Sequence, residues 1–410
     1  MGGDNEKVKV LHRKKAGNES EKQTRIIDRR ICFSYRIVYH HVPLSTITAP
    51  VVNKFTSQEL TAKSHVANRA FTGGSRQGTT QRQLIYEADI GAIGDVLLHA
   101  IVYNDAKTAD GYNFLPMLEK IEPYLSELDF TMANQESMPG GTEIGLSTYP
   151  AFNSPSQIID NLQTVGIDLL SMANNHSLDR GLNGLNSAIS HLKRVGMPYV
   201  GVYENEGDRN EKRIFDVNDI LIGVLSYTYG TNGIPIPHGH EYAVALLDRE
   251  KVVADIKGMR EEVDIVVVHA HWGDEYARTP NHGQRSLAQE FVEAGADIIF
   301  GHHPHVIQPI ERLKDRYGRE AIVFYSLGNF LSGQQFEYKD IGGIGKVKVQ
   351  KIVQGEDEQL KLTSPSILPT YVHHRNHTNY QVMLLEEAYE KGYIHKSADM
   401  MKQHTEKMMQ

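Results

Sequence analysis

Apolar runs of strand length alternate with stretches of helical period from about Leu84 onward. The first part of this region predicts strand 90–95, helix 114–128, strand 129–136, helix 156–166, strand 167–175, helix 184–196 and strand 198–203. Residues 213–229 predict a hairpin around Asn218-Asp219. Continuous β-branched runs between helices are typical of a sheet that is buried on both faces and at least partly parallel.

The second part repeats this rhythm, with helix 249–263, strand 264–272, helix 285–295, strand 297–303 and strand 321–329. Two later runs, 343–353 and 359–368, predict antiparallel additions to the sheet. A helical tail is expected over 383–410. The order of elements indicates an α/β protein whose main domain covers residues 84–382.

The residues before this domain have a different character. Residues 1–30 form a basic tail, and residues 53–83 are polar, without either period, and predict a linker. Segment 31–52 follows Arg29 and Arg30, as a membrane anchor would, but Arg36, His40, His41 and Pro43 interrupt it. An arginine at mid-bilayer costs roughly 2.5–3.5 kcal/mol on insertion scales. The sequence therefore predicts a degenerate anchor and soluble behaviour of the chain.

Charge and cysteine content narrow the chemistry. The net charge is −8, and residues 1–86 hold 15 Lys and Arg against 6 Asp and Glu, so the body of the chain is strongly acidic. Nucleic-acid binders present a basic face instead, so no nucleic-acid partner is expected. The single cysteine, Cys32, excludes an internal disulfide and a thiolate zinc cluster. A bound metal would need His, Asp, Glu and Asn ligands, which suit zinc, manganese, iron or magnesium.

Polar side chains of ligand type follow most of the predicted strands. In chain order they are Asp95, Asn134 with Glu136, Asn174 with Asn175 and His176, His269 with His271, His302 with His303 and His305, and Asn329. Each group alone also fits a turn, a helix cap or a hydrogen-bonded polar pocket. Function in α/β sheets gathers at the carboxyl ends of strands. Together, the groups predict a site for two cations about 3.5–4 Å apart.

Two spacings suggest roles within such a site. Pro304 fixes the backbone between His303 and His305, so that both rings can reach adjacent ions. Asn175 offers a neutral carbonyl oxygen to a metal, and His176 beside it can act as a general acid. Asp179 is available to orient that imidazole.

These residues resemble the CapA/PgsA family, the poly-γ-glutamate capsule biosynthesis proteins of the calcineurin-like metallophosphoesterase superfamily. The matching segments, in family order over about 88–335, are GDVLLH, ANQES, SMANNHSLDRGLNGL, VVVHAHWGDEY, GADIIFGHHPHVIQPIE and FYSLGNFL. The resemblance implies a metallophosphatase-like αββα sandwich of two mixed sheets flanked by helices. Family members usually have one N-terminal transmembrane helix and a domain outside the cytoplasmic membrane, which implies a bacterial membrane location.

The resemblance also implies residue roles. Metal ligands would be Asp95, Glu136, Asn175, His271, His303 and His305, and the catalytic pair would be His176 with Asp179. Substrate-binding positions would be Arg180, Glu275, Tyr276, His302 and Asn329. The superfamily's opening Asp-x-His motif is missing, because Val96 and Leu97 follow Asp95, so one ion would lose a ligand or use Glu136 instead. His99-Ala100 stands where the family often has Gly-Arg.

Three functions follow as hypotheses. The resemblance implies a component of poly-γ-glutamate synthesis and export, working with ligase and transport subunits. The ligand set itself favours a metal-dependent hydrolase that acts on a phosphorylated small molecule or polymer, with one or two ions of manganese, zinc or iron. A binding module would use the same ions to hold an anionic polymer without turnover.

Overall fold

The computed structural model describes residues 83–394, which belong to one compact unit of the chain, Val66–Gln410. The predicted basic tail, the anchor-like segment 31–52 and all of the linker except Gln83 lie outside the described residues, as do residues 395–410. None of the described helices is both long enough and apolar enough to cross a membrane.

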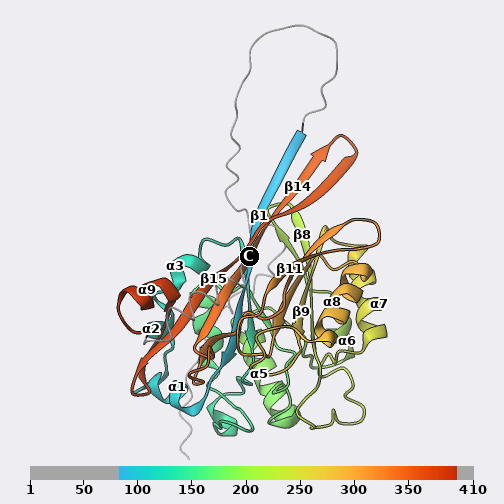
Figure 1. Cartoon of the computed structure of the whole chain (residues 1–410). Coiled ribbons are helices and arrows are strands. Elements are labelled where there is room, and N and C mark those ends of the chain that lie inside the picture. The colour runs from blue at the N-terminus through green and yellow to red at the C-terminus, as the bar shows by residue number, and fades with distance from the viewer. Residues whose placement is uncertain (1–82, 395–410) are drawn as a thin grey trace, which may run out of the picture. The chain divides into compact units, whose positions relative to one another are not determined.

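Two mixed sheets form the centre of the fold (Figure 1). The larger sheet has the order β16 (Thr378–Leu384), β15 (Asp357–Arg375), β14 (Ile341–Gln354), β1 (Gln83–Leu97), β4 (Phe130–Gln135), β5 (Leu169–Ser171) and β6 (Tyr199–Val200), and β13 (Asn329–Ser332) pairs with the end of β1. The smaller sheet has the order β11 (Ile310–Lys314), β12 (Glu320–Phe324), β10 (Ile298–His302), β9 (Ile265–His271), β8 (Ile220–Thr228) and β7 (Ile214–Val217). A two-stranded ribbon, β2 (Lys107–Thr108) with β3 (Gly111–Tyr112), stands apart from both.

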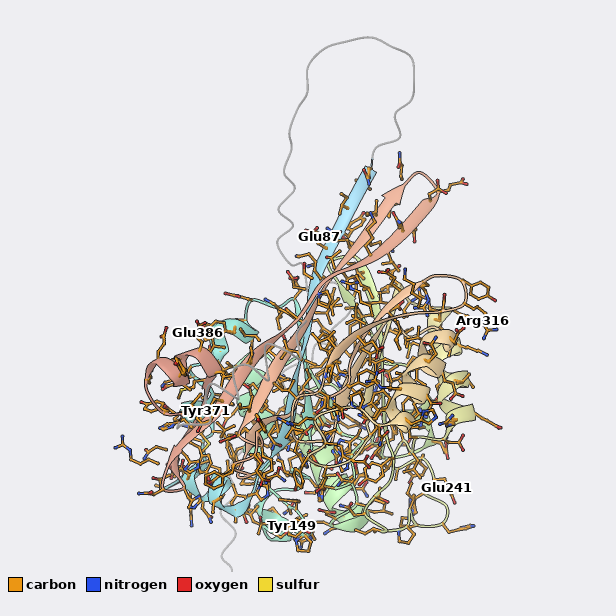
Figure 2. The ribbon with its side chains drawn as sticks, viewed as in Figure 1. Glu87, Tyr149, Glu241, Arg316, Tyr371 and Glu386 are labelled. Atoms are coloured by element: carbon orange, nitrogen blue, oxygen red, sulfur yellow. The ribbon has the colours of Figure 1, made fainter. Side chains whose placement is uncertain are left out.

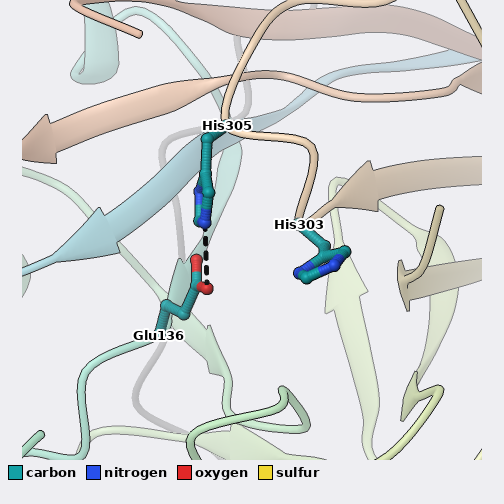
Figure 3. A group of neighbouring side chains, drawn as sticks. All are labelled: Glu136, His303 and His305. Atoms are coloured by element: carbon teal, nitrogen blue, oxygen red, sulfur yellow. Dashed lines mark ion pairs between the residues drawn. The ribbon is translucent and has the colours of Figure 1, made fainter. Parts of the chain in front are cut away.

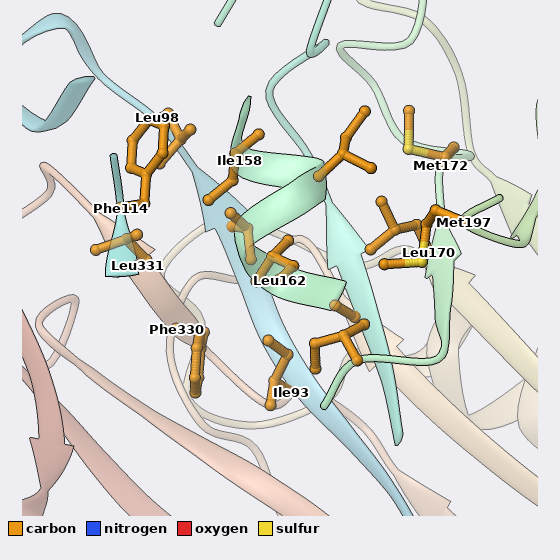
Figure 4. Close-up of a cluster of buried hydrophobic side chains, with 14 of the residues drawn as sticks. Ile93, Leu98, Phe114, Ile158, Leu162, Leu170, Met172, Met197, Phe330 and Leu331 are labelled. Atoms are coloured by element: carbon orange, nitrogen blue, oxygen red, sulfur yellow. The ribbon is translucent and has the colours of Figure 1, made fainter. Parts of the chain in front are cut away.

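Three apolar clusters define four layers. Side chains from both sheets, such as Ile90 and Ile265, form the cluster between the sheets. The larger sheet packs on its other face against α1 (Ala100–Asp105), α2 (Leu115–Leu118), α3 (Glu122–Leu125), α4 (Gln157–Thr164) and α5 (Gly181–Val195). Figure 4 shows part of this cluster, with Ile158 and Leu162 of α4 beside the larger sheet. The smaller sheet packs against α7 (Arg249–Arg260) and α8 (His282–Ala294). The fold is therefore the expected αββα sandwich.

Strand alternation explains why the sheets separate these clusters. On β9, Ile265 and Val267 face the other sheet, whereas Val266 and Val268 face α7 and α8. Side chains two apart on a strand share a face, so each run of β-branched residues serves two cores. The hairpin of β7 and β8 has the predicted turn, because Asn218 and Asp219 both have positive φ and link Val217 to Ile220.

A β-bulge at Gly94 sets the direction of Asp95. Ile93 faces the helical layer, and the register between β1 and β4 shifts after it, so that Asp95 lies opposite Asn134. The extra residue turns Asp95 toward the space between the sheets, whereas Val96 again faces the helices. A Cβ atom at Gly94 would lie 2.0 Å from the carbonyl oxygen of Gly328, so only glycine fits there.

Some boundaries differ from the prediction. The helix expected over 114–128 is two short helices, α2 and α3, each with a proline in its first turn. The strand expected over 321–329 is divided between the two sheets, as β12 and β13. The expected helical tail does not start at Met383, which completes β16; its described part is α9 (Leu385–Glu390). The two late antiparallel runs are confirmed as β14 and β15.

Candidate metal centre

The space between the sheets changes from apolar to ionisable at the carboxyl ends of the strands. On β9, the face that presents Ile265 and Val267 continues with His269 and His271. On β4, the face of Phe130 and Met132 continues with Asn134 and then Glu136, which follows the strand. The predicted metal ligands are all 4% exposed or less, so the site is the polar end of a core layer.

Asp95 has imidazole and amide partners on several sides. Its Oδ2 lies 3.0 Å from Nδ1 of His305, and its Oδ1 accepts a hydrogen bond of 2.8 Å from Nδ2 of Asn134 and lies 3.3 Å from Nδ1 of His302. Burial alone would raise the pKa of Asp95, but the hydrogen bonds and charges of His302 and His305 bring that pKa below its ordinary value. The carboxylate is therefore ionised and available as a ligand.

Glu136 is the carboxylate of the cluster whose charge is least compensated by hydrogen bonds. Its side chain is fully buried, and neither carboxylate oxygen has a hydrogen-bond partner among residues 83–394. Its Oε1 lies 3.6 Å from Nε2 of His305 (Figure 3). The same oxygen lies 3.7 Å from Nε2 of His271. Burial raises the pKa of Glu136 well above its ordinary value; the charge of His305 opposes this, and Asp95 adds to it. A buried carboxylate without donors fits a cation ligand.

His271 and His303 offer neutral ring nitrogens to a metal. Burial holds the pKa of His271 well below its ordinary value and lowers that of His303 to about 4, in both cases with help from a neighbouring imidazole. The Nδ1 atoms of both rings are buried and have no hydrogen-bond partner within the described part of the chain. Oδ1 of Asn175 lies 2.9 Å from Nε2 of His271, so both atoms face the same space. Neutral imidazole is the form that binds metal.

Two sets of donors are close enough to hold a cation. Each set has one ligand atom per residue within 4.8 Å of the others: Glu136, His303 and His305 form one, and Asp95, Glu136 and His271 form the other. Glu136 belongs to both sets, as a bridging carboxylate would. The unpartnered oxygens and nitrogens fit one or two borderline divalent cations.

His176 and Asp179 form a dyad beside this cluster. Nδ1 of His176 lies 2.7 Å from Oδ2 of Asp179, which also accepts a hydrogen bond of 2.6 Å from the backbone N–H of Phe152. The ring of Phe152 packs edge-on against His176, with ring centres 4.7 Å apart. His176 is therefore held by a carboxylate on one side and an aromatic ring on another, which leaves Nε2 to exchange a proton.

His269 and His302 form a chain of contacts that ends at Asp95. Nδ1 of His269 lies 3.0 Å from Nε2 of His302, and their rings are stacked at 7°. His302 in turn faces Asp95. His269 and His302 therefore orient the carboxylate of Asp95. Because both ring nitrogens of His302 face protein groups, these contacts do not favour the predicted role of His302 in binding substrate.

The other predicted pocket residues divide into two groups. Tyr276 is 44% exposed, and its ring centre lies 6.1 Å from that of His305. Burial and the neighbouring carboxylate of Glu275 raise the pKa of Tyr276 to about 12. The guanidinium of Arg180 instead bonds the carbonyls of Ile144 and Gly145 and so fixes that loop. The amide Nδ2 of Asn329 donates to Oε1 of Gln334 and to the carbonyl oxygen of Lys339, and not to a proposed metal ligand.

Three residues around the centre are absent from the predicted site. Asn134 bonds Asp95, as described above. Tyr229 is half-exposed and lies with its ring centre 4.8 Å from that of His303 and parallel to that of His271. Asn232 accepts a hydrogen bond of 3.2 Å from Nδ2 of Asn175, which turns the Oδ1 of Asn175 toward His271. The strand-end pattern did single out Asn134, although not as a partner of Asp95, whereas the loop of Tyr229 and Asn232 has no periodic pattern.

The layers and the buried carboxylate–imidazole cluster at the strand ends define a metallophosphoesterase-like αββα protein. The family described as "Bacterial capsule synthesis protein PGA_cap" matches residues 89–334, and the chain belongs to this family.

Curated relatives agree with this assignment. The chain is 31% identical over 253 residues to "PGA biosynthesis protein CapA" of Bacillus subtilis (strain 168), an alignment that covers 59% of this chain and 62% of that protein. It is 29% identical over 251 residues to "Capsule biosynthesis protein CapA" of Bacillus anthracis, with 59% of each chain covered. The aligned part thus spans about three fifths of the length of these relatives.

Solved structures are more distant. The "calcineurin-like phosphoesterase YfkN from Bacillus subtilis" aligns with a TM-score of 0.43 and 15% identity, covering 78% of this chain and all of that one. The fold assignment rests on the four layers described above.

Proposed function

We propose that this protein takes part in the biosynthesis of capsule poly-γ-glutamate and that its αββα domain is a divalent-cation-dependent phosphoesterase. The membership of the PGA_cap family and the names of the two Bacillus relatives support the first part. A single observation supports the second. Glu136 is fully buried between His271 and His305, and neither carboxylate oxygen accepts a hydrogen bond from the described residues, an arrangement that a bound cation would stabilise.

The ligands proposed for the cations are Asp95, Glu136, Asn175, His271, His303 and His305. Bound cations would act as Lewis acids toward a phosphoryl oxygen and neutralise charge as it develops. Leu97 stands at the position of the histidine in the superfamily's Asp-x-His motif and is 2% exposed, so it supplies no ligand, and Glu136 serves in its place.

The chain's own groups perform the remaining tasks. As a water molecule forms the new bond to phosphorus and the ester P–O bond breaks, His176 gives the proton at Nε2 to the leaving oxygen as a general acid, and the proton of the attacking water passes to solvent. Asp179 accepts a hydrogen bond from Nδ1 of His176 and so orients the ring and keeps a proton on that nitrogen, which leaves Nε2 for the transferred proton. The rings of Tyr229 and Tyr276 border the centre and restrict the access of water.

The experiment is hydrolysis of a generic phosphoester by the full chain with added manganese or zinc. Activity is expected in the unchanged protein, and it should be lost in Asp95→Asn and in His303→Ala together with bound cation. His176→Gln should retain the cation and lose about 10²–10⁴-fold in rate. Cation bound at stoichiometric level without any turnover would reject the phosphoesterase.

A polymer-binding module is the second candidate. The strongly acidic body of the chain would repel polyglutamate unless cations offset the charge, so the same cluster serves binding without turnover. The role in capsule synthesis, and the proposed ligase and transport partners at the bacterial membrane, are tested in cells that lack the native component. Polymer export should return with the unchanged protein and stay absent with Asp95→Asn.

A further inference from the structure

The loop that follows β13 has an unusual backbone. Phe336, Glu337 and Tyr338 are three successive non-glycine residues with φ of 62°, 53° and 72°. Each left-handed residue of this kind costs about 1–2 kcal/mol relative to a right-handed conformation. Strain of this size persists where the surroundings impose it, and it is concentrated at sites that bind ligands. The strained residues and Lys339 lie outside residues 89–334, so family membership says nothing about them.

The strained turn places Lys339 against Tyr276, beside the candidate metal centre. The Nζ atom of Lys339 lies 4.9 Å from the centre of the Tyr276 ring. That ring lies 6.1 Å from the ring of His305, one of the proposed ligands. One tyrosine therefore contacts both an ammonium group and an imidazole of the cluster.

Three side-chain hydrogen bonds fix this loop to the site. Asn329 pairs with Asp95 in the register of β1 and β13, and its Nδ2 donates to the carbonyl oxygen of Lys339 at 2.8 Å and to Oε1 of Gln334 at 3.0 Å. Nε2 of Gln334 donates to the hydroxyl of Tyr276 at 3.4 Å. The position of Lys339 is thus set by Asn329 of β13, the residue that pairs with Asp95 of β1.

The charge on Lys339 is only weakly satisfied. Its ion-pair partner in the described region is Glu337, with Nζ and Oε2 3.5 Å apart, and the Glu337 side chain is 82% exposed. Exposed pairs of this kind contribute about 0.2–1 kcal/mol, so an anion can displace the carboxylate. The Lys339 side chain is 21% exposed, which leaves its ammonium group partly desolvated and open to a ligand.

From these contacts we propose that Lys339 and Tyr276 form a second anion subsite, which binds one oxyanion of a polyanionic ligand while the cation centre binds another. This rests on the proposed function for the cation centre. The ligand needs two oxyanions joined by a linker that spans the Tyr276 ring. Successive carboxylates of an acidic polymer and successive phosphates of a polyphosphate both satisfy this requirement.

The test is calorimetric binding to the full-length, cation-loaded protein, with three probes: inorganic phosphate, pyrophosphate and a short poly-γ-glutamate. Lys339→Ala should lower the affinity for at least one of the two polyanions, pyrophosphate or poly-γ-glutamate, at least tenfold. The affinity for inorganic phosphate should change less than twofold. Lys339→Arg should restore binding, and Lys346→Ala, an exposed lysine on β14, should have no effect. Glu337→Gln should tighten polyanion binding about two- to fivefold, because it removes the competing carboxylate.

The two arms identify the source of the anions. Dependence on Lys339 for the polyglutamate alone assigns the subsite to polymer, and dependence for pyrophosphate alone assigns it to phosphate. Equal polyanion affinities of the unchanged protein, Lys339→Ala and Glu337→Gln would overturn the subsite. Cation content is measured separately, so a protein that binds no cation but keeps polyanion binding dependent on Lys339 would reject the cation centre and retain the subsite. The Glu337→Gln variant keeps the test decisive should Lys339→Ala fail to fold.

Discussion

Nδ1 of His305 lies 3.0 Å from Oδ2 of Asp95, although 210 positions separate the two residues in the chain. Asp95 comes from the larger sheet and His305 follows a strand of the smaller one, so this contact joins the two sheets at their carboxyl ends. His305 has φ of 59° and His303 has φ of 95°, a strained turn that directs both rings toward the carboxylates. The candidate centre thus forms only when both sheets are in place.

Glu136→Gln is expected to stabilise the cation-free protein and to abolish cation binding. The substitution removes a carboxyl group whose ionised form is disfavoured by burial and whose oxygens have no hydrogen-bond donor in the described region, and such a group costs about 1–3 kcal/mol. Chemical unfolding in the presence of a chelator should give a higher free energy of unfolding for the variant. With saturating manganese the order should reverse, because only the unchanged protein gains binding energy. A variant less stable than the unchanged protein in chelator would contradict this.

Cation binding should release protons and strengthen as the pH rises. Burial alone lowers the pKa of His305, but the charges of Glu136 and Asp95 prevail and raise that pKa to about 9. Below pH 9 the imidazole must therefore lose a proton before it can ligate. Calorimetry in buffers of different ionisation enthalpy should detect this release at pH 7, and pH-independent affinity between pH 6 and 9 would argue against His305 as a ligand.

The same pKa predicts how the cation-free protein responds to pH. The pKa of His305 is raised in the folded state, so its contribution to stability is fully present below the ordinary value of 6.5 and is lost as the pH rises through about 9. The free energy of unfolding in chelator should accordingly fall between pH 6.5 and 9, and His305→Gln should remove most of that fall. An equal fall in both proteins would assign it to other groups.

Gly94→Ala is expected to disrupt the centre through the backbone. The added Cβ atom would meet the carbonyl oxygen of Gly328 at 2.0 Å, so the bulge must shift, at a cost of about 1–3 kcal/mol. Cation content should fall with it, because the bulge directs Asp95. Gly258→Ala in α7 is the matched control: its Cβ has no neighbour closer than 4.0 Å, so the helix should gain up to about 1 kcal/mol. Thermal unfolding and elemental analysis measure both effects.

Asn232→Ala should weaken cation binding without removing any ligand. Asn232 accepts from Nδ2 of Asn175 and so holds the other side of that amide toward His271. Loss of such an orienting partner typically costs 10–100-fold in metal affinity. Asn232→Asp keeps the acceptor and should retain most of the affinity. Competition with a fluorescent chelator measures both, and an unchanged affinity in Asn232→Ala would refute the orienting role.

Strand alternation made the centre predictable from the sequence. His271 continues the face of Ile265 and Val267, and Glu136 continues that of Phe130 and Met132, so periodicity alone places both between the sheets. The arrangement of these strands in two sheets was predicted from the resemblance to a known family. Within the described region, the elements predicted over 156–166, 184–196 and 249–263 are present as α4, α5 and α7 with shifted ends.

What periodicity could not predict depends on tertiary contacts. The run 321–329 is one apolar stretch in sequence, yet Gly328, with φ of 66°, lets the chain pass from one sheet to the other. Tyr229 and Asn232 lie in a loop whose conformation is set by partners far away in sequence. Arg180 was expected at the pocket, but the carbonyls of a neighbouring loop occupy its guanidinium, which no local pattern reveals.

The proposed metal centre is best tested by elemental analysis of purified full-length protein, after dialysis against manganese or zinc and removal of free metal. At least one equivalent of cation per chain is expected in the unchanged protein, and less than a tenth of that in Asp95→Asn and in Glu136→Gln. A folded protein that retains no cation, or two variants that retain as much as the unchanged chain, would contradict a metal centre built by Asp95, Glu136 and the histidines around them.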